Sequence, residues 1–202
     1  MSLLEPAFAS LSDVKGPDGK IKTSKFLEGC SCVLPIVDKL GSGFSIVKSD
    51  INGNITRLST FASKDPVKYE DYFQIVRDDT SGLQPGKYAG NTSVTKGMLW
   101  LKRALQFITG LIEKLLSDPS KTVSQAASET YKATLSKYHG MLTSGAFSVA
   151  LKIVPSRESF LAKLQCENPE ADLGKLVQLL SPILQEIDAF LIECGQDDPA
   201  KM

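Results

Sequence analysis

Three polar side chains that could recognise a polyol occur at helical spacing in the stretch SDINGNITRL, residues 49–58. Asp50, Asn54 and Arg57 stand at i, i+4 and i+7, so they share one face if the stretch is a helix. A carboxylate, an amide and a guanidinium together supply acceptors and planar donors that suit vicinal hydroxyls. A simpler interpretation is a surface ion pair between Asp50 and Arg57, and the stretch taken alone favours that interpretation.

Other structures compete for the same stretch. Asn52-Gly53 between alternating apolar residues is typical of a two-residue hairpin turn, and by local rules the hairpin ranks above the helix. Asn54-Ile55-Thr56 is a glycosylation acceptor triplet, although such triplets also arise by chance. A calcium loop is excluded, because an EF-hand needs Gly at its sixth position and an acidic ligand at its twelfth. Counted from Asp50, Gly53 is fourth and Phe61 is twelfth.

Trp100 and His139 are the only tryptophan and the only histidine of the chain. Each alone is typical of structure: a core aromatic residue and a lone hydrogen-bonding histidine. Because an aromatic face can stack on a sugar ring, Trp100 beside the polar trio would instead form a sugar site. No nucleophile, phosphate-loop or dinucleotide motif occurs, and four cysteines with one histidine match no zinc pattern. We therefore expect no enzyme, no catalytic residue, no metal and no cofactor.

Composition limits the possible classes of protein. The 202 residues carry 23 Lys and Arg against 23 Asp and Glu, which argues against a nucleic-acid binder. No apolar run reaches the roughly 18 residues of a transmembrane helix, and the N-terminus lacks the pattern of a secretory signal. Four cysteines without a disulfide pattern suit buried thiols in a reducing compartment. We expect one domain over residues 1–202 in the cytosol.

The elements that position the polar residues are predicted to be helices. Residues 98–116 carry two adjacent apolar stripes at steps of three and four, which predicts a central helix in contact with neighbours on two sides. Similar periodicity predicts a helix over 173–194, and the Asp65-Pro66 pair predicts the start of another over 66–78. Further helices are expected over 122–138, 141–153 and 157–165, and another between residues 23 and 80 is indicated by the apolar residues Phe26, Leu27, Cys30, Val33 and Leu34. Periodicity thus predicts an all-α domain, with 43–60 as the contested segment.

Three longer motifs, SDINGNITRL, MLWLKRALQFI and KYHGMLTSGAFSVALKIVP, in this order and at these separations, resemble the glycolipid transfer protein family. The stretch FLEGCSCVLPIVDKLGSGF is similar to the family's early helix. The resemblance covers essentially the whole chain. It implies a single-domain, two-layer helical sandwich of about eight helices that encloses a hydrophobic tunnel, and it tips the contested segment from hairpin to helix.

The resemblance also implies roles for particular residues. Asp50 is expected to bind a sugar hydroxyl and the ceramide amide N–H, while Asn54 and Arg57 bind further sugar hydroxyls. Trp100 would stack on the first sugar, and His139 would donate to the ceramide amide oxygen. Apolar positions expected near the acyl-chain tunnel are Phe107, Phe147, Ala150 and Leu151.

Within the family, a branch that carries ceramide-1-phosphate has cations at the positions of Asn54 and Trp100, so this chain looks like a binder of neutral glycolipids. Three departures qualify the likeness. Arg57 replaces the Lys of the best-known animal members and is not equivalent to it, which suggests a one-sugar head group. Met141 replaces an interfacial Trp, and the tail CGQDDPAKM lacks the aromatic residue that closes the site in those members.

The expected function is a carrier that binds one glycosphingolipid, such as glucosylceramide or another monohexosylceramide, and transfers it between membranes. It would act as a monomer with transient contact at membrane surfaces. PIVDKLGS lacks the paired phenylalanines with which animal members bind an endoplasmic-reticulum anchor protein, which puts that partner in doubt. Two alternatives remain open: a lipid sensor or signalling adaptor with the same pocket, and a carrier of a ceramide-type lipid with another head group.

Overall fold

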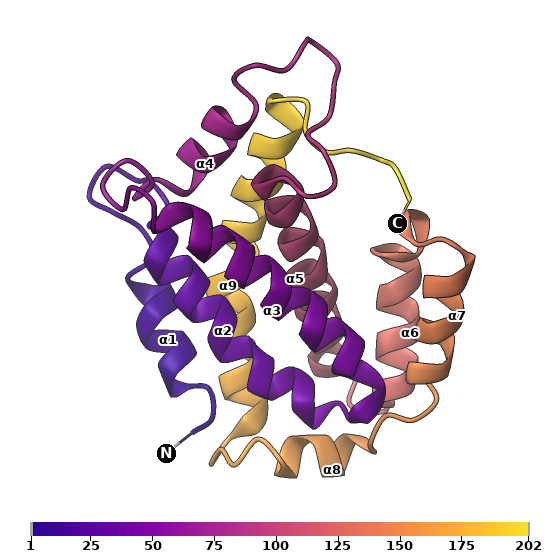
Figure 1. Ribbon diagram of the computed structural model, residues 1–202. Helices are drawn as coiled ribbons and strands as arrows, with labels where there is room; N and C mark the ends of the chain where they lie inside the picture. Colours follow the sequence, from indigo (N-terminus) through magenta and orange to yellow (C-terminus); the bar gives the residue numbers. More distant parts are fainter. Residues whose placement is uncertain (1, 202) are drawn as a thin grey trace.

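The computed structural model describes residues 2–201, and over that range the fold is helical, without β-strands (Figure 1). This confirms the all-α prediction, with nine α-helices rather than about eight in the described range. The elements are α1 (Glu5–Ser12), α2 (Thr23–Lys39), the 3-10 helix η1 (Ser42–Phe44), α3 (Ser45–Ala62), α4 (Tyr72–Asp79), α5 (Val94–Ser117), α6 (Val123–Ala133), the 3-10 helix η2 (Ser136–Tyr138), α7 (Met141–Ala150), α8 (Arg157–Ala162) and α9 (Pro169–Glu193).

Helix α5 is the centre of the fold and packs against α3, α4, α6 and α9. Its first turn begins where the Ser93 side chain accepts a hydrogen bond from the Lys96 backbone N–H, a typical N-cap. Both predicted stripes are buried: Leu101 and Leu105 on one, Phe107 and Leu111 on the other. The predicted central helix is therefore confirmed.

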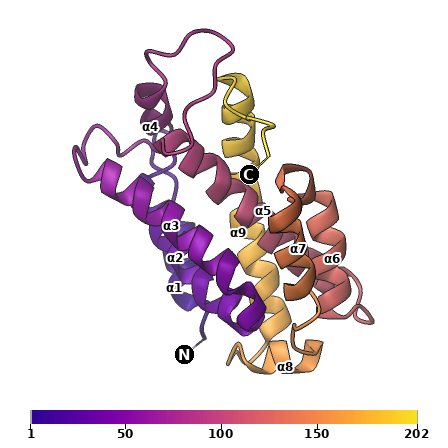
Figure 2. The ribbon, with the colours of Figure 1, turned by 45° about the vertical axis from the view of Figure 1, so that its right-hand side comes forward.

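Two layers of helices surround this core. Helices α1, α2 and α3 lie side by side in front of α5 and α9 in Figure 1, and the turned view of Figure 2 keeps the same neighbours together. Helices α6 and α7 lie to the right of α5 in Figure 1, and α4 lies to its upper left. None of the described helices is long and apolar enough to cross a membrane.

Helix α3 runs without interruption through Asn52-Gly53, so the hairpin that local rules favour is wrong. The apolar stripe of this segment explains the outcome. Ile51, Ile55 and Leu58 are buried against neighbouring helices, and hydrophobic burial of three such side chains outweighs the roughly 1 kcal/mol that a helical glycine costs. Gly53 itself is exposed and has open space around its Cα.

Helix α4 begins later than predicted. It starts at Tyr72, not at residue 66, with the Asp71 side chain accepting from the Phe73 backbone N–H as the N-cap. The preceding segment pairs instead with residues before α2: the Tyr72 N–H donates to the Ile21 carbonyl at 2.9 Å, and the Thr23 N–H donates to the Glu70 carbonyl at 2.9 Å. These long-range bonds hold residues 70–72 extended, and periodicity could not reveal them.

Candidate functional site

The three polar residues of SDINGNITRL line one cavity of about 430 Å³. The Asn54 side-chain amide donates to the Asp50 backbone carbonyl at 3.0 Å and to the Asp50 carboxylate at 3.3 Å. Arg57 turns away from Asp50 and donates to the backbone carbonyls of Asn91 (3.4 Å) and Ser93 (3.3 Å). The structure therefore forms no ion pair between Asp50 and Arg57, and that simpler interpretation is wrong.

Asp50 is held in a partly desolvated position. Burial raises the pKa of its carboxyl, while the hydrogen bond from Asn54 and the charge of Arg57 lower it in part. Asn54 is the one side chain of the described residues that donates to this carboxylate. Since a carboxylate offers about four lone-pair sites, most of its acceptor capacity is directed into the cavity or into solvent.

Trp100 on α5 and His139 after η2 line the same cavity. Their rings are stacked, with centroids 6.1 Å apart and planes inclined by 24°. Behind Trp100 lies the Arg103 guanidinium, which also covers the ring of Tyr138 at 3.4 Å. The ring of Trp100 is thus in contact with a buried cation that does not itself line the cavity.

Burial lowers the pKa of the His139 ring, which favours its neutral form. Nδ1 lies 3.2 Å from the Tyr131 hydroxyl, which in turn donates to Ser144 Oγ at 3.2 Å. A tyrosine hydroxyl has one proton, so in this arrangement Nδ1–H donates to Tyr131 and Nε2 is an acceptor. Reversal of the bond between the two hydroxyls would let Tyr131 donate to Nδ1 and make Nε2 the donor.

The apolar end of the cavity is closed by aromatic rings. Phe147 lines it and stacks on Tyr131, with centroids 4.4 Å apart. Phe107 and Phe44 lie behind Phe147, with centroid distances of 5.5 Å and 6.1 Å to it. Of the four residues expected along an acyl-chain tunnel, Phe147 lines the cavity, whereas Phe107, Ala150 and Leu151 are buried in the packed core beside it.

A second, smaller recess of about 180 Å³ adjoins the polar side of this cavity and shares Asp50, Asn54, Arg57 and Trp100 with it. Its remaining lining residues are Asn91, Lys96, Ala200 and Lys201. Sequence reasoning did not predict Lys96, Ala200 and Lys201 as lining residues, because nothing in the local pattern connects residue 96 with residue 200. Together, cavity and recess offer polar groups at one end and apolar surface at the other.

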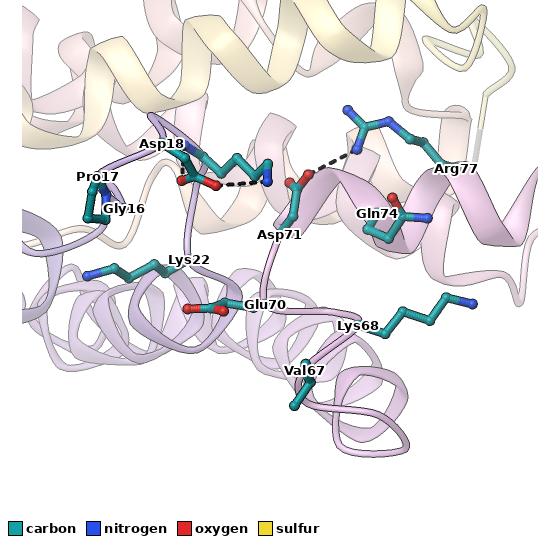
Figure 3. A pocket seen from close by; sticks show the side chains of 11 residues that line it. Gly16, Pro17, Asp18, Lys22, Val67, Lys68, Glu70, Asp71, Gln74 and Arg77 are labelled. Atoms are coloured by element: carbon teal, nitrogen blue, oxygen red, sulfur yellow. Dashed lines mark hydrogen bonds and ion pairs between the residues drawn. The ribbon is translucent and has the colours of Figure 1, made fainter.

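A larger hollow of about 790 Å³ lies near α4, at the other end of α3 from α7 (Figures 1 and 3). Four of its charged groups form two ion pairs within the hollow, which the dashed lines of Figure 3 mark. Lys20 pairs with Asp18 at 2.8 Å, and Arg77 pairs with Asp71 at 3.0 Å. A ligand there would have to compete with existing ion pairs, so the cavity around Asp50 is the better candidate.

Comparison with known proteins identifies the family to which the chain belongs. Residues 21–166 match the family model of the glycolipid transfer protein (GLTP). Glycolipid transfer protein 1 of Arabidopsis thaliana is 35% identical over 198 residues, which cover 98% of this chain and 96% of that protein.

Solved structures agree in fold. A structure of FAPP2, described as selecting simple glycosphingolipids with the GLTP fold, has a TM-score of 0.86 at 27% identity, and the match covers 100% of both chains. Mouse ceramide-1-phosphate transfer protein in its apo form also gives a TM-score of 0.86, at 21% identity over 98% of this chain and 99% of that one, and it shows the fold alone. On the match of the family model and the similarity to the Arabidopsis protein, the chain belongs to the glycolipid transfer protein family, whose members carry lipids and are not enzymes.

Proposed function

We propose that the protein is a carrier that binds one monohexosylceramide, such as glucosylceramide, and transfers it between membranes. The observation that carries the proposal is the composition of the cavity around Asp50. A carboxylate, an amide, a guanidinium and an indole ring meet at its polar end, and the aromatic ring of Phe147 closes its apolar end. Such a gradient suits a ligand with a sugar head and hydrocarbon chains.

Each polar group has a role in this proposal. Asp50 accepts from a sugar hydroxyl and from the ceramide amide N–H, and its unused acceptor capacity supports both contacts. Asn54 and Arg57 bind further hydroxyls, and Trp100 stacks on the sugar ring. His139 donates from Nε2 to the ceramide amide oxygen once Tyr131 donates to Nδ1, which the pair of hydroxyls at Tyr131 and Ser144 permits.

The charges around the cavity support a neutral sugar over a phosphate. Asn54 and Trp100 are uncharged, and a phosphate is bound best by charge-assisted donors. The buried cations nearby are already paired: Lys96 with Asp198 and Arg103 with Asp197. A dianionic head group would have to compete with these carboxylates.

Contact with a membrane is supported by exposed apolar side chains beside the cavity mouth. Met141 and Leu142 at the start of α7 are 91% and 90% exposed. Ile46 and Val149 are also exposed, and Ile46 lines the cavity itself. We call Ile46, Met141, Leu142 and Val149 the apolar rim. In the proposal the rim enters the interfacial region of a bilayer and brings the cavity to the lipid, from the cytosolic side.

The apolar end of the cavity need only bury the hydrocarbon chains about as favourably as a bilayer does. Burial is worth about 0.8 kcal/mol per methylene in either environment, so a closely matched tunnel lets chains enter and leave. Phe147 and its aromatic neighbours must move for the chains to enter, because they fill the apolar end. The polar groups then provide selection among head groups, since each unsatisfied buried hydrogen bond costs about 1–3 kcal/mol.

A vesicle-to-vesicle transfer assay with a head-group panel tests the proposal. The panel contains ceramide, ceramide-1-phosphate, and ceramides with one and two sugars. We expect transfer of the one-sugar lipid at protein amounts far below the lipid amount, slower transfer of the two-sugar lipid, and little transfer of the other two. Binding of the one-sugar lipid without transfer would leave a sensor or adaptor, and preferred transfer of ceramide-1-phosphate would refute the choice of head group.

A further inference from the structure

The segment that follows α9 returns across the molecule to the polar end of the cavity. It leaves α9 at the top of Figure 1 and ends beside α6 and α7. Ala200 and Lys201 of this segment line the small recess together with Asp50, Asn54 and Arg57. Residues 196–201 are called the tail below.

Two consecutive aspartates fix the tail to α5. Asp197 pairs with Arg103 at 2.9 Å and with Lys102 at 3.6 Å, and Asp198 pairs with Lys96. The Asp198 backbone carbonyl accepts a second bond from Arg103 at 2.7 Å. Burial raises the pKa of both aspartate carboxyls, but attraction to these cations outweighs it, and both pKa values lie below the ordinary value.

The cations on the α5 side of this contact are deeply buried. Lys96, Lys102 and Arg103 are 7%, 3% and 2% exposed. A buried cation needs an acidic partner, because removal of that partner leaves an unpaired charge out of water. The tail supplies that partner for Lys96 and Arg103. Ion pairs with buried cations of α5, and not ion pairs between exposed side chains, therefore determine the position of the tail.

Two further contacts fix the direction of the tail. The Gln196 side chain accepts from the Ala89 N–H at 2.9 Å and donates to the Lys87 carbonyl at 3.1 Å, which holds the start of the tail to the loop before α5. The Ala200 N–H donates to the Asp198 carboxylate at 2.8 Å, which turns the chain back toward the recess. The residues after Asp198 are thereby held over Trp100 and the polar trio.

We infer that the tail is a determinant of head-group size: held by Asp197 and Asp198, it forms the outer wall of the recess and excludes a second sugar. The inference rests on the proposed glycolipid function. Asp197 and Asp198 are positioning residues in it, because they do not line the recess themselves and act through the placement of Ala200 and Lys201. Arg103 links this wall to the ring of Trp100, on which the first sugar would stack.

The experiment compares transfer of one-sugar and two-sugar ceramides by the full chain and four variants. Asp198→Asn and Asp197→Asn weaken the hold of α5 on the tail, whereas Asp198→Glu keeps the charge. Asp188→Asn is the matched control, because Asp188 pairs with the buried Lys102 but does not belong to the tail. The measured quantity is the ratio of the two transfer rates, with the melting temperature recorded for each variant.

We expect the one-sugar to two-sugar ratio to fall about fivefold to tenfold in the two tail variants, the size of effect that one hydrogen bond or contact produces. Asp198→Glu should restore much of the ratio, and Asp188→Asn should leave it unchanged even where the melting temperature falls. An unchanged ratio in both tail variants, or an equal fall in the control, would overturn the inference.

A fifth variant, Ala200→Phe, leaves the aspartates intact and narrows the recess. The expected result is slower transfer of the one-sugar lipid, and unchanged transfer would contradict a recess bounded by the tail. The two hypotheses fail differently. If the unsubstituted chain transfers no glycosphingolipid, the proposed function fails; if it transfers both lipids and the tail variants keep its ratio, only the role of the tail fails.

Discussion

Gly97 on α5 leaves the space that the Arg57 side chain of α3 occupies. A Cβ atom at position 97 would lie 3.0 Å from Arg57 Cδ and 3.6 Å from Asn54 Oδ1. The absence of a side chain at one position of α5 therefore determines where the guanidinium of α3 can lie. Arg57 reaches the carbonyls of Asn91 and Ser93 because it passes over this glycine.

Gly97→Ala should displace the Arg57 side chain and slow transfer of a one-sugar ceramide. Stability should not fall, since Ala is favoured over Gly inside a helix by roughly 0.5–1 kcal/mol. We expect transfer to fall about tenfold, the effect of one lost charge-assisted hydrogen bond, measured in the vesicle assay with the melting temperature beside it.

Gly110→Ala is the matched control for this change. Its Cβ would lie 3.0 Å from Thr130 Cγ2, the same clearance on the same helix, but away from the cavity around Asp50. Equal losses of transfer in the two variants would show that crowding of α5, and not the placement of Arg57, explains the result.

Asp50→Asn should nearly abolish transfer without loss of stability. Loss of a charged acceptor costs about 1.5–3 kcal/mol of binding, or roughly tenfold to more than a hundredfold in affinity. Burial raises the pKa of Asp50, so the folded protein favours the protonated carboxyl and the ionised carboxyl opposes folding. The stability contributed by the protonated form is full below the unfolded pKa and is lost as pH rises through the folded pKa. Chemical denaturation at pH 3 and pH 7 should therefore show the advantage of the variant only at pH 7. Retained transfer would refute the role of Asp50.

Much of the fold could be predicted from periodicity, and the exceptions have physical causes. The two stripes of 98–116 were sufficient to predict α5, because burial on nearly all sides leaves a wide apolar arc. Local turn preference failed at Asn52-Gly53, where packing of Ile51, Ile55 and Leu58 determines the outcome. The predicted start of α4 was wrong because backbone hydrogen bonds to Ile21 and Thr23, about fifty residues earlier, hold the chain extended at residues 70–72.

The candidate site could likewise be predicted only in part. Helical spacing could place Asp50, Asn54 and Arg57 on one face, but only family resemblance connected them with Trp100 and His139. The resemblance drew attention to the tail only for the aromatic residue that it lacks, and neither kind of reasoning predicted that the tail pairs with α5. Asp198 is 102 positions from Lys96 in sequence, and neither residue type at its own position indicates burial. An ion pair between residues so far apart in sequence can be identified only from the fold, which brings the segment after α9 against α5.

His139 should make the protein less stable below pH 6.5. Burial lowers the pKa of the ring, and no carboxylate of the described residues pairs with it. Asp50 and Arg57 line the same cavity as the ring, and Lys137 is two residues away in sequence. Arg103 contacts Trp100, on which the ring is stacked, and Tyr131 supplies the hydroxyl. Stability gained from the neutral ring is full above the unfolded pKa and is lost as pH falls through the lower folded pKa, by up to about 1.4 kcal/mol per pH unit.

Denaturation of the protein and of His139→Gln between pH 5 and pH 8 measures this effect. The unsubstituted protein should lose stability toward pH 5 by more than the variant does, and parallel curves would contradict the prediction. Because the chain has one histidine, its imidazole nitrogen signals can be assigned without ambiguity. We expect the proton on Nδ1 in the free protein, where Tyr131 donates to Ser144, and on Nε2 with a one-sugar ceramide bound.

Met141→Ser combined with Leu142→Ser should impair membrane contact while leaving the cavity intact. Both side chains are almost fully exposed, so the double variant should keep its melting temperature and its affinity for a short-chain, water-soluble glycosylceramide. Burial of each apolar side chain in a bilayer interface contributes up to about 1.5–3 kcal/mol, so vesicle binding and transfer should fall at least tenfold. Val67→Ser is the control, since Val67 is 86% exposed but lines the hollow near α4. Equal transfer by the double variant and the control would remove the apolar rim from the mechanism and leave membrane contact to another surface.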